Sequence, residues 1–388
     1  MYKELFNLSV KNFAASLIGF LNTYLIVNYI SLDFLGDFTI FLSVIGVINI
    51  VFTIVPNNFS IFRIQDDKNF ERILFNYYLL VPLFFLPLFL LIWFLLYQNI
   101  SFIWFYLYII GSGFLSYFDI ICQAKGRLKF YYNILLLITI SKLVIVLVVS
   151  YFKLNFNTFI FFNSIVLATS FFIIIFYLNR NFLKTLIRKP RSIFDIVKFL
   201  KLNFKILKPY YLNVILKKIR SNSIILLFTP FVSVDIIGLY SLFIKPQSFV
   251  FGLFRTMEAF FMKKENIIKF KKLFYQHIFL LSLLMFCLSF SIGICYLKIT
   301  VNQFYFVENF ILAILSFSYI KYIYMRSSLL STYSNKTLNI SEILFLLITV
   351  LLISINYYFN FNSIIVIIFT YFLSTQSLQL FLIYKTQK

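Results

Sequence analysis

The chain has 388 residues, a formal net charge of +22, 62% hydrophobic and 12% charged residues, and a mean hydropathy of +0.93. Soluble domains carry about 25% charged residues. This composition therefore excludes a water-soluble domain and predicts an all-α membrane protein with several transmembrane helices. The three cysteines, Cys122, Cys287 and Cys295, lack metal-ligand spacing, so we expect neither a disulfide nor a metal site.

Apolar runs of about 20 residues are long enough to cross a bilayer as helices. Taken in chain order, such runs predict twelve transmembrane helices, in two halves of six. The predicted spans are residues 8–30, 36–59, 74–97, 101–121, 131–151, 157–179, 209–229, 236–258, 273–296, 310–332, 341–359 and 362–384.

Basic residues predict the orientation of these helices. With the N-terminus inside, the inner segments hold 24 Lys and Arg residues, whereas the outer loops hold only Lys153 and Lys298. This asymmetry follows the positive-inside rule with both termini cytoplasmic. The net charge therefore reflects topology, and we expect no nucleic acid among the partners.

A short motif occurs twice, about half a chain length apart, as SLDFLGDFTIF at 31–41 and SVDIIGLYSLF at 233–243. Each copy follows the first span of one half, as expected for parallel repeats related by an axis along the membrane normal. We expect the glycines to permit tight turns and the aspartates to cap the helices that follow. These residues are Asp33, Gly36, Asp235 and Gly238. The alternative is two unrelated turns of similar composition.

The halves predict three regions along the chain. An N-terminal six-helix bundle covers residues 1–180, a basic amphipathic cytoplasmic linker covers 181–208, and a C-terminal six-helix bundle covers 209–388. In the linker, lysines and apolar residues occupy opposite sides of a helix, which is typical of a helix lying on the inner leaflet. A linker that only obeys the positive-inside rule explains it equally well.

Several basic residues fall inside the predicted spans. A Lys or Arg at mid-membrane costs roughly 2.5–3.5 kcal/mol, so it normally faces water or a partner. No comparable set of acids is evident within the spans, which predicts a cationic lumen between the halves for an anionic cargo such as a phosphate. The residues predicted to line this lumen are Lys217, Arg220, Lys245, Lys218, Lys142 and Lys321.

Two absences argue against an enzyme. The sequence contains no GxxxxGK[ST] phosphate-binding loop, so we expect no ATPase in this chain. The predicted outer loops are short and leave no room for the catalytic acids or arginines of a membrane polymerase. We therefore expect no catalytic residues.

Three stretches resemble one transporter family. VDIIGLYSLFIKP at 234–246 is similar to a glycine-x-tyrosine turn at the start of span eight, PNNFSIFRI at 56–64 to the end of span two, and QAKGRLKFYY at 123–132 to a connection between spans four and five. With the twelve-span layout, they resemble the polysaccharide-transport (O-antigen, Wzx-type) branch of the MATE-like MOP exporter superfamily.

The resemblance implies a flippase of the bacterial cytoplasmic (inner) membrane. Its cargo would be an undecaprenyl-pyrophosphate-linked oligosaccharide, an O-antigen or capsule repeat unit, moved to the outer leaflet by alternating access. Membrane lipids and other polysaccharide assembly proteins would be its partners. Family members often carry an acid near the position of Asn222, which is uncharged here. We expect no cofactor, and coupling to H⁺ or Na⁺ stays open.

Two alternatives remain at this stage. A multidrug exporter of the same fold would normally use intramembrane acids to bind organic cations. A membrane-embedded polysaccharide polymerase, from a different class, would need a larger outer loop.

Overall fold

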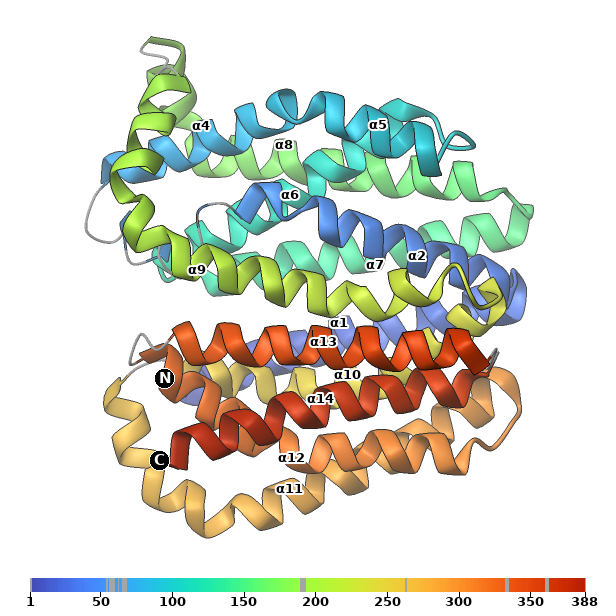
Figure 1. Ribbon diagram of the computed structural model, residues 1–388. Coiled ribbons are helices and arrows are strands. Elements are labelled where there is room, and N and C mark those ends of the chain that lie inside the picture. Colours follow the sequence, from blue (N-terminus) through green and yellow to red (C-terminus); the bar gives the residue numbers. More distant parts are fainter. Residues whose placement is uncertain are drawn as a thin grey trace. The chain divides into compact units, whose positions relative to one another are not determined.

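The computed structural model describes residues 2–53, 55, 60–61, 63–64, 68–188, 193–261, 264–331, 335–359 and 363–387. All regular structure in these ranges is helical (Figure 1). The elements are α1 (Tyr2–Tyr29), α2 (Leu32–Ile48), the 3₁₀ helix η1 (Val51–Thr53), α4 (Lys68–Phe84), α5 (Leu86–Leu96), α6 (Phe102–Ala124), α7 (Leu128–Phe152), α8 (Phe156–Arg188), α9 (Ile193–Phe228), α10 (Val234–Phe261), α11 (Lys264–Val301), α12 (Phe306–Ser331), α13 (Asn335–Phe359) and α14 (Ile364–Gln387).

The helices confirm a multi-spanning α-helical protein. Over the described ranges, eight helices are long and apolar enough to cross a membrane, or nine if the bent pair α4–α5 counts as one span. Residues Phe13–Tyr29 of α1 and Phe306–Tyr319 of α12 are shorter apolar segments, and α9 is not among the eight. Several helices, such as α11, extend beyond the predicted spans, because a helix can continue where its sequence turns polar at the interface.

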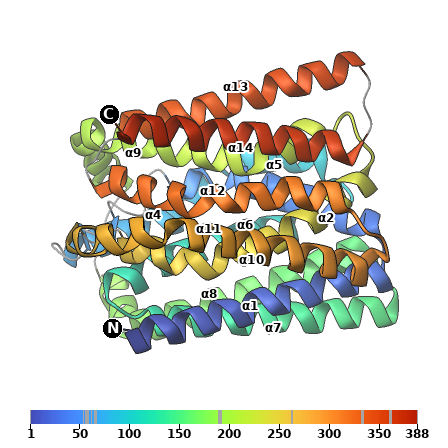
Figure 2. The same ribbon diagram turned by 90° about the horizontal axis from the view of Figure 1, so that it is seen from below.

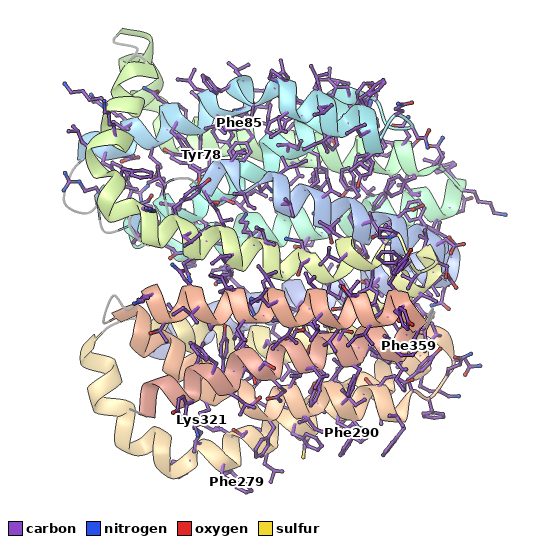
Figure 3. All side chains as sticks on the ribbon, in the orientation of Figure 1. Tyr78, Phe85, Phe279, Phe290, Lys321 and Phe359 are labelled. Carbon is purple, nitrogen blue, oxygen red and sulfur yellow. The ribbon has the colours of Figure 1, made fainter. Side chains whose placement is uncertain are left out.

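The predicted span 74–97 is a broken helix. Here α4 and α5 meet at Phe85 with a bend of 48° (Figure 3). Pro82 lies inside α4, and Pro87 lies in the first turn of α5. Proline lacks a backbone N–H and fits the first turn of a helix best, so these two residues explain why the helix breaks at this point.

The chain divides into two compact units. Unit 1 comprises Met1–Val44 and Leu216–Lys388, and unit 2 comprises Ile45–Ile215. This partition differs from the predicted regions 1–180, 181–208 and 209–388, because α1 packs on α10 and is grouped with it. A unit defined by contacts need not coincide with a sequence repeat, so the predicted regions stay predictions.

The predicted linker and the seventh predicted span belong to one helix. The sequence predicts that the linker ends at residue 208 and that the transmembrane segment begins at Pro209, and α9 is continuous from Ile193 to Phe228. Where the transmembrane segment begins within α9 stays a prediction. Proline removes only its own N–H donor, and here the helix continues through it.

Unit 2 has an aromatic core. Phe52, Tyr78, Phe114 and Tyr117 are almost completely buried, and their rings form a connected cluster in which Tyr78 lies 5.3 Å from Tyr117 and 5.8 Å from Phe52 (Figure 3). Aromatic pairs at these distances add to the stability gained from burial. The cluster joins η1, α4 and α6 into one packed body.

In unit 1, α1 packs against α10 and α11. The ring of Phe20 lies 5.0 Å from Phe249 and 4.7 Å from Tyr296. Near the end of α1, the Asn28 amide donates a hydrogen bond to the carbonyl of Thr300 at 3.2 Å. These contacts attach the first helix of the chain to the C-terminal helices.

The two copies of the repeated motif contact each other within unit 1. A Cβ at Gly36 would lie 2.1 Å from the carbonyl oxygen of Val234, and a Cβ at Gly238 would lie 2.3 Å from that of Leu32. Leu32 and Val234 are equivalent positions of the repeat, so the contact is reciprocal, as in a two-fold interface. The reciprocity supports the prediction of parallel repeats.

The predicted roles of the repeat residues need correction. Both glycines lie inside helices, α2 and α10, so they permit a close helix crossing and not a tight turn. Asp33 lies in the first turn of α2, but the hydroxyl of Ser31 accepts the hydrogen bond from the Phe34 N–H at 3.0 Å. Asp235 likewise lies in the first turn of α10. An acid in that position still interacts favourably with the helix dipole.

The two ends of the chain lie at the same end of unit 1 in both views (Figures 1 and 2). This placement agrees with an even number of spans. That this end faces the cytoplasm stays a prediction.

Candidate functional site

The last part of α9 carries a basic segment. Lys217, Lys218 and Arg220 follow the buried Leu216, and each is half-buried. Lys217 and Arg220 are three residues apart and share one side of the helix, whereas Lys218 is rotated by about 100° from Lys217. These three charges make this part of α9 less apolar than the other long helices.

Polar residues after the basic segment bind their own helix. Ser221 and Asn222 each donate a hydrogen bond to the carbonyl of Lys218, at 2.9 and 2.8 Å, and Ser223 donates to the carbonyl of Arg220 at 3.1 Å. Such local bonds satisfy hydroxyl and amide groups without an outside partner. The hydroxyl and amide groups of this part of α9 are therefore satisfied locally, and its positive charges are the feature that a cargo could recognise.

Arg220 forms an ion pair with Glu342 of α13. The Nε atom of Arg220 lies 2.6 Å from Oε2 of Glu342, and the two side chains are 18% and 5% exposed. The guanidinium carbon also lies 5.6 Å from the ring centre of Phe345, one turn further along α13. A charged pair with so little exposure depends on close geometry, because both ions lose hydration.

The sequence analysis missed Glu342. It found no set of acids within the spans to match the basic residues, and the ion pair shows that Arg220 has an acidic partner. The available signal was a lone acid at the start of the predicted span 341–359. Its pairing with a residue of another helix could not be inferred from a single sequence.

A polar stripe continues from Glu342 along α13 into the C-terminal helices. Glu342, Thr349 and Asn356 recur every seven residues and are all buried. The Thr349 hydroxyl donates to the Ser374 hydroxyl of α14 at 2.9 Å. Seven residues are close to two helical turns, so the three side chains share one face. This face of α13 therefore holds polar groups inside a helix bundle, and the sequence analysis did not identify them.

Lys245 lies on α10 next to Pro246 and is half-buried. It shares a helix face with Gly238, which contacts the α2 backbone, and with Phe249, which contacts α1. Among the described residues, no ion-pair partner of Lys245 is found. The adjacent Gln247 is buried and donates to the carbonyl of Leu312 at 3.3 Å.

The six predicted lumen residues lie on four helices. Lys217, Lys218 and Arg220 adjoin on α9 in unit 1, which also contains Lys245 on α10 and Lys321 on α12 (Figure 3). Lys142 lies on α7 in unit 2. The lumen was predicted between the halves of the molecule, and its lining by these residues stays a prediction. Within the described ranges, no group of three or more His, Cys, Asp or Glu could hold a metal ion.

Comparison with known proteins identifies the fold. No family model and no curated protein matches the sequence. Among solved structures, the chain is similar to a point mutant of the MATE transporter VcmN from Vibrio cholerae, with a TM-score of 0.62 and 12% identity over 99% of this chain and 97% of that one. The bent form of VcmN gives a TM-score of 0.58 with the same identity and coverage. The chain therefore has the fold of a MATE transporter.

Proposed function

We propose that the protein is a flippase that moves an undecaprenyl-pyrophosphate-linked oligosaccharide, such as an O-antigen or capsule repeat unit, across the bacterial cytoplasmic membrane. The fold, which is that of a MATE transporter, supports a role in transport. We expect the cargo to move by alternating access. A pyrophosphate and a glycan cannot cross hydrocarbon unaided, because burying charged and polar groups is costly. A protein path lined by positive charges lowers that cost.

The basic segment of α9 is the observation that carries this proposal. Three half-buried cations, Lys217, Lys218 and Arg220, lie within four residues of one helix, and Arg220 pairs with Glu342. Three positive charges so close together suit an anionic cargo. Lysine and arginine are the usual protein ligands of phosphate.

Deletion of the gene tests the cargo. Loss of surface glycan with accumulation of the lipid-linked unit on the inner leaflet would support the proposal. A deletion strain that keeps normal long-chain glycan, in a host without a related flippase, would contradict it.

Substitutions at Lys217 test the role of charge. Lys217→Ala should abolish glycan export at unchanged protein level in the membrane, and Lys217→Arg should retain more export than Lys217→Glu. Export by Lys217→Glu at the wild-type rate would show that the charge of this side chain does not act on the cargo.

A second candidate function is export of organic cations. The observation that favours it is Glu342, a buried acid of the kind that a cation-binding site needs. An efflux assay with a fluorescent organic cation separates the two functions. Glu342-dependent efflux of the dye, with glycan assembly unaffected by gene deletion, would establish the second candidate in place of the first.

A further inference from the structure

We propose that Glu342 and the cargo compete for the guanidinium of Arg220. Glu342 thereby sets how much negative charge a cargo must carry to bind there. The inference rests on the proposed function, since it assigns a specificity residue to the same site. Its starting point is the 2.6 Å ion pair that joins α9 to α13 inside unit 1. In the absence of cargo, Glu342 is the anion that Arg220 binds.

The surroundings of the pair make competition between anions strong. Glu342 is 4% exposed as a residue, and Phe345 lies beside the guanidinium, so little water screens the charges. Where screening is weak, a buried arginine needs an anionic partner. A cargo anion can therefore take Arg220 only if it interacts with the guanidinium more favourably than the carboxylate does.

A pyrophosphate meets this condition better than a singly charged or neutral group. It carries more charge than a carboxylate, and its oxygens can accept two parallel hydrogen bonds from a guanidinium. Lys217 lies on the same side of α9, one turn before Arg220, and adds a second positive charge near the incoming anion. Neutral sugars cannot displace Glu342, and monoanions do so weakly.

The ion pair is not the contact that holds α13 against α14. Thr349 of α13 donates a hydrogen bond to Ser374 of α14. Glu342 would then be released from α9 without separating α13 from α14. Its carboxylate acts as a counter-ion that the cargo replaces.

Anion binding to the purified protein in nanodiscs of neutral lipid tests the inference. The probes are inorganic pyrophosphate and inorganic phosphate, titrated by calorimetry. We expect the wild type to bind pyrophosphate at least tenfold more tightly than phosphate. Glu342→Gln should tighten phosphate binding at least tenfold and so reduce this discrimination, and adding Arg220→Gln should abolish the gain.

Glu71→Gln is the matched control. Glu71 forms a separate ion pair, with Lys125 in unit 2 at 2.7 Å, so its loss should change neither dissociation constant. If Glu342→Gln cannot be purified, Glu342→Asp replaces it. The shorter side chain weakens the contact, and phosphate binding should tighten at least threefold.

Three results would overturn the inference. They are a wild type that binds both anions equally, a carboxylate variant that gains no affinity for phosphate, and a gain in affinity that persists without Arg220. The test is independent of glycan export in cells. If the deletion strain assembles glycan normally while the anion competition is observed, only the proposed cargo is rejected. If the deletion strain loses surface glycan but the anion competition is not observed, only the role of Glu342 is rejected.

Discussion

The glycine crossing between α2 and α10 gives a sharp test of the structure. A Cβ at Gly36 would lie 2.1 Å from the Val234 carbonyl oxygen and 2.6 Å from its Cγ1 atom, and a Cβ at Gly238 would lie 2.3 Å from the Leu32 carbonyl oxygen. Two of these three contacts involve backbone atoms, which a change of rotamer cannot relieve. Gly36→Ala and Gly238→Ala therefore force the helices apart.

The magnitude follows from two opposing effects. Alanine favours a helix over glycine by about 1 kcal/mol. Extra volume in a packed core costs typically about 1–3 kcal/mol, and occasionally more. Gly19 in α1 provides the control, because a Cβ there meets no atom within 4 Å. Gly19→Ala should be neutral or stabilising, and each crossing variant should be about 1–3 kcal/mol less stable than this control.

Thermal unfolding of the detergent-purified variants, followed by the loss of the monodisperse peak in size-exclusion chromatography, measures these differences. The double variant Gly36→Ala with Gly238→Ala should cost less than the two single changes together, because one separation of α2 from α10 relieves both clashes. Crossing variants as stable as Gly19→Ala would refute the close contact.

Two further predictions concern the C-terminal bundle. Arg220→Gln or Glu342→Gln alone should lower stability by about 3–5 kcal/mol, because each leaves a buried charge without its ion-pair partner. The double variant should unfold closer to the wild type, and a double variant with the full cost of both changes would contradict this. Thr349→Val should cost about 0.5–1.5 kcal/mol through the lost bond to Ser374. Thr169→Val is the control and should cost less, because the exposed Thr169 hydroxyl bonds to carbonyls of its own helix. Equal unfolding temperatures for the two valine variants would show that the hydrogen bond from Thr349 to α14 is not stabilising.

The membrane fold could be predicted from the sequence because its main determinants are local. The length of each apolar run and the placement of Lys and Arg are properties of single segments. The repeat could also be recognised, since Gly36 and Gly238 occupy matching places in the order of spans. Their function could not, because a glycine at a helix start permits either a turn or a close crossing, and the partner backbone decides between them.

The charged residues were harder to interpret for a related reason. The sequence identified Arg220 as a cation that needs a partner, but the partner is on a helix distant in the chain. Glu342 lies near the start of an apolar run, where an acid usually reaches the interface. The longer α13, which begins at Asn335, places Glu342 about 10 Å along the helix, beyond the first turn. Hydropathy marks the apolar run but not how far the helix extends beyond it, so it could not predict that Glu342 lies well inside α13.

The broken helix α4–α5 also escaped prediction as a break, although its prolines were visible. Prolines within transmembrane segments are compatible with straight, kinked and broken helices. The residue at which the helix breaks, Phe85, depends on how both proline-containing parts pack. The sequence alone does not contain that packing.

The reciprocal contact of Gly36 and Gly238 has a consequence for the origin of the chain. Each glycine packs on the backbone of the other motif at the equivalent position, which is the contact that two identical subunits make across a two-fold axis. If a gene duplication joined two six-helix proteins, this crossing existed first as a dimer interface and became internal when the copies fused. Since then the two surfaces could diverge independently, whereas the two glycines remained under a common steric constraint. Selection could thus give one bundle the Arg220–Glu342 pair without altering the crossing between the copies.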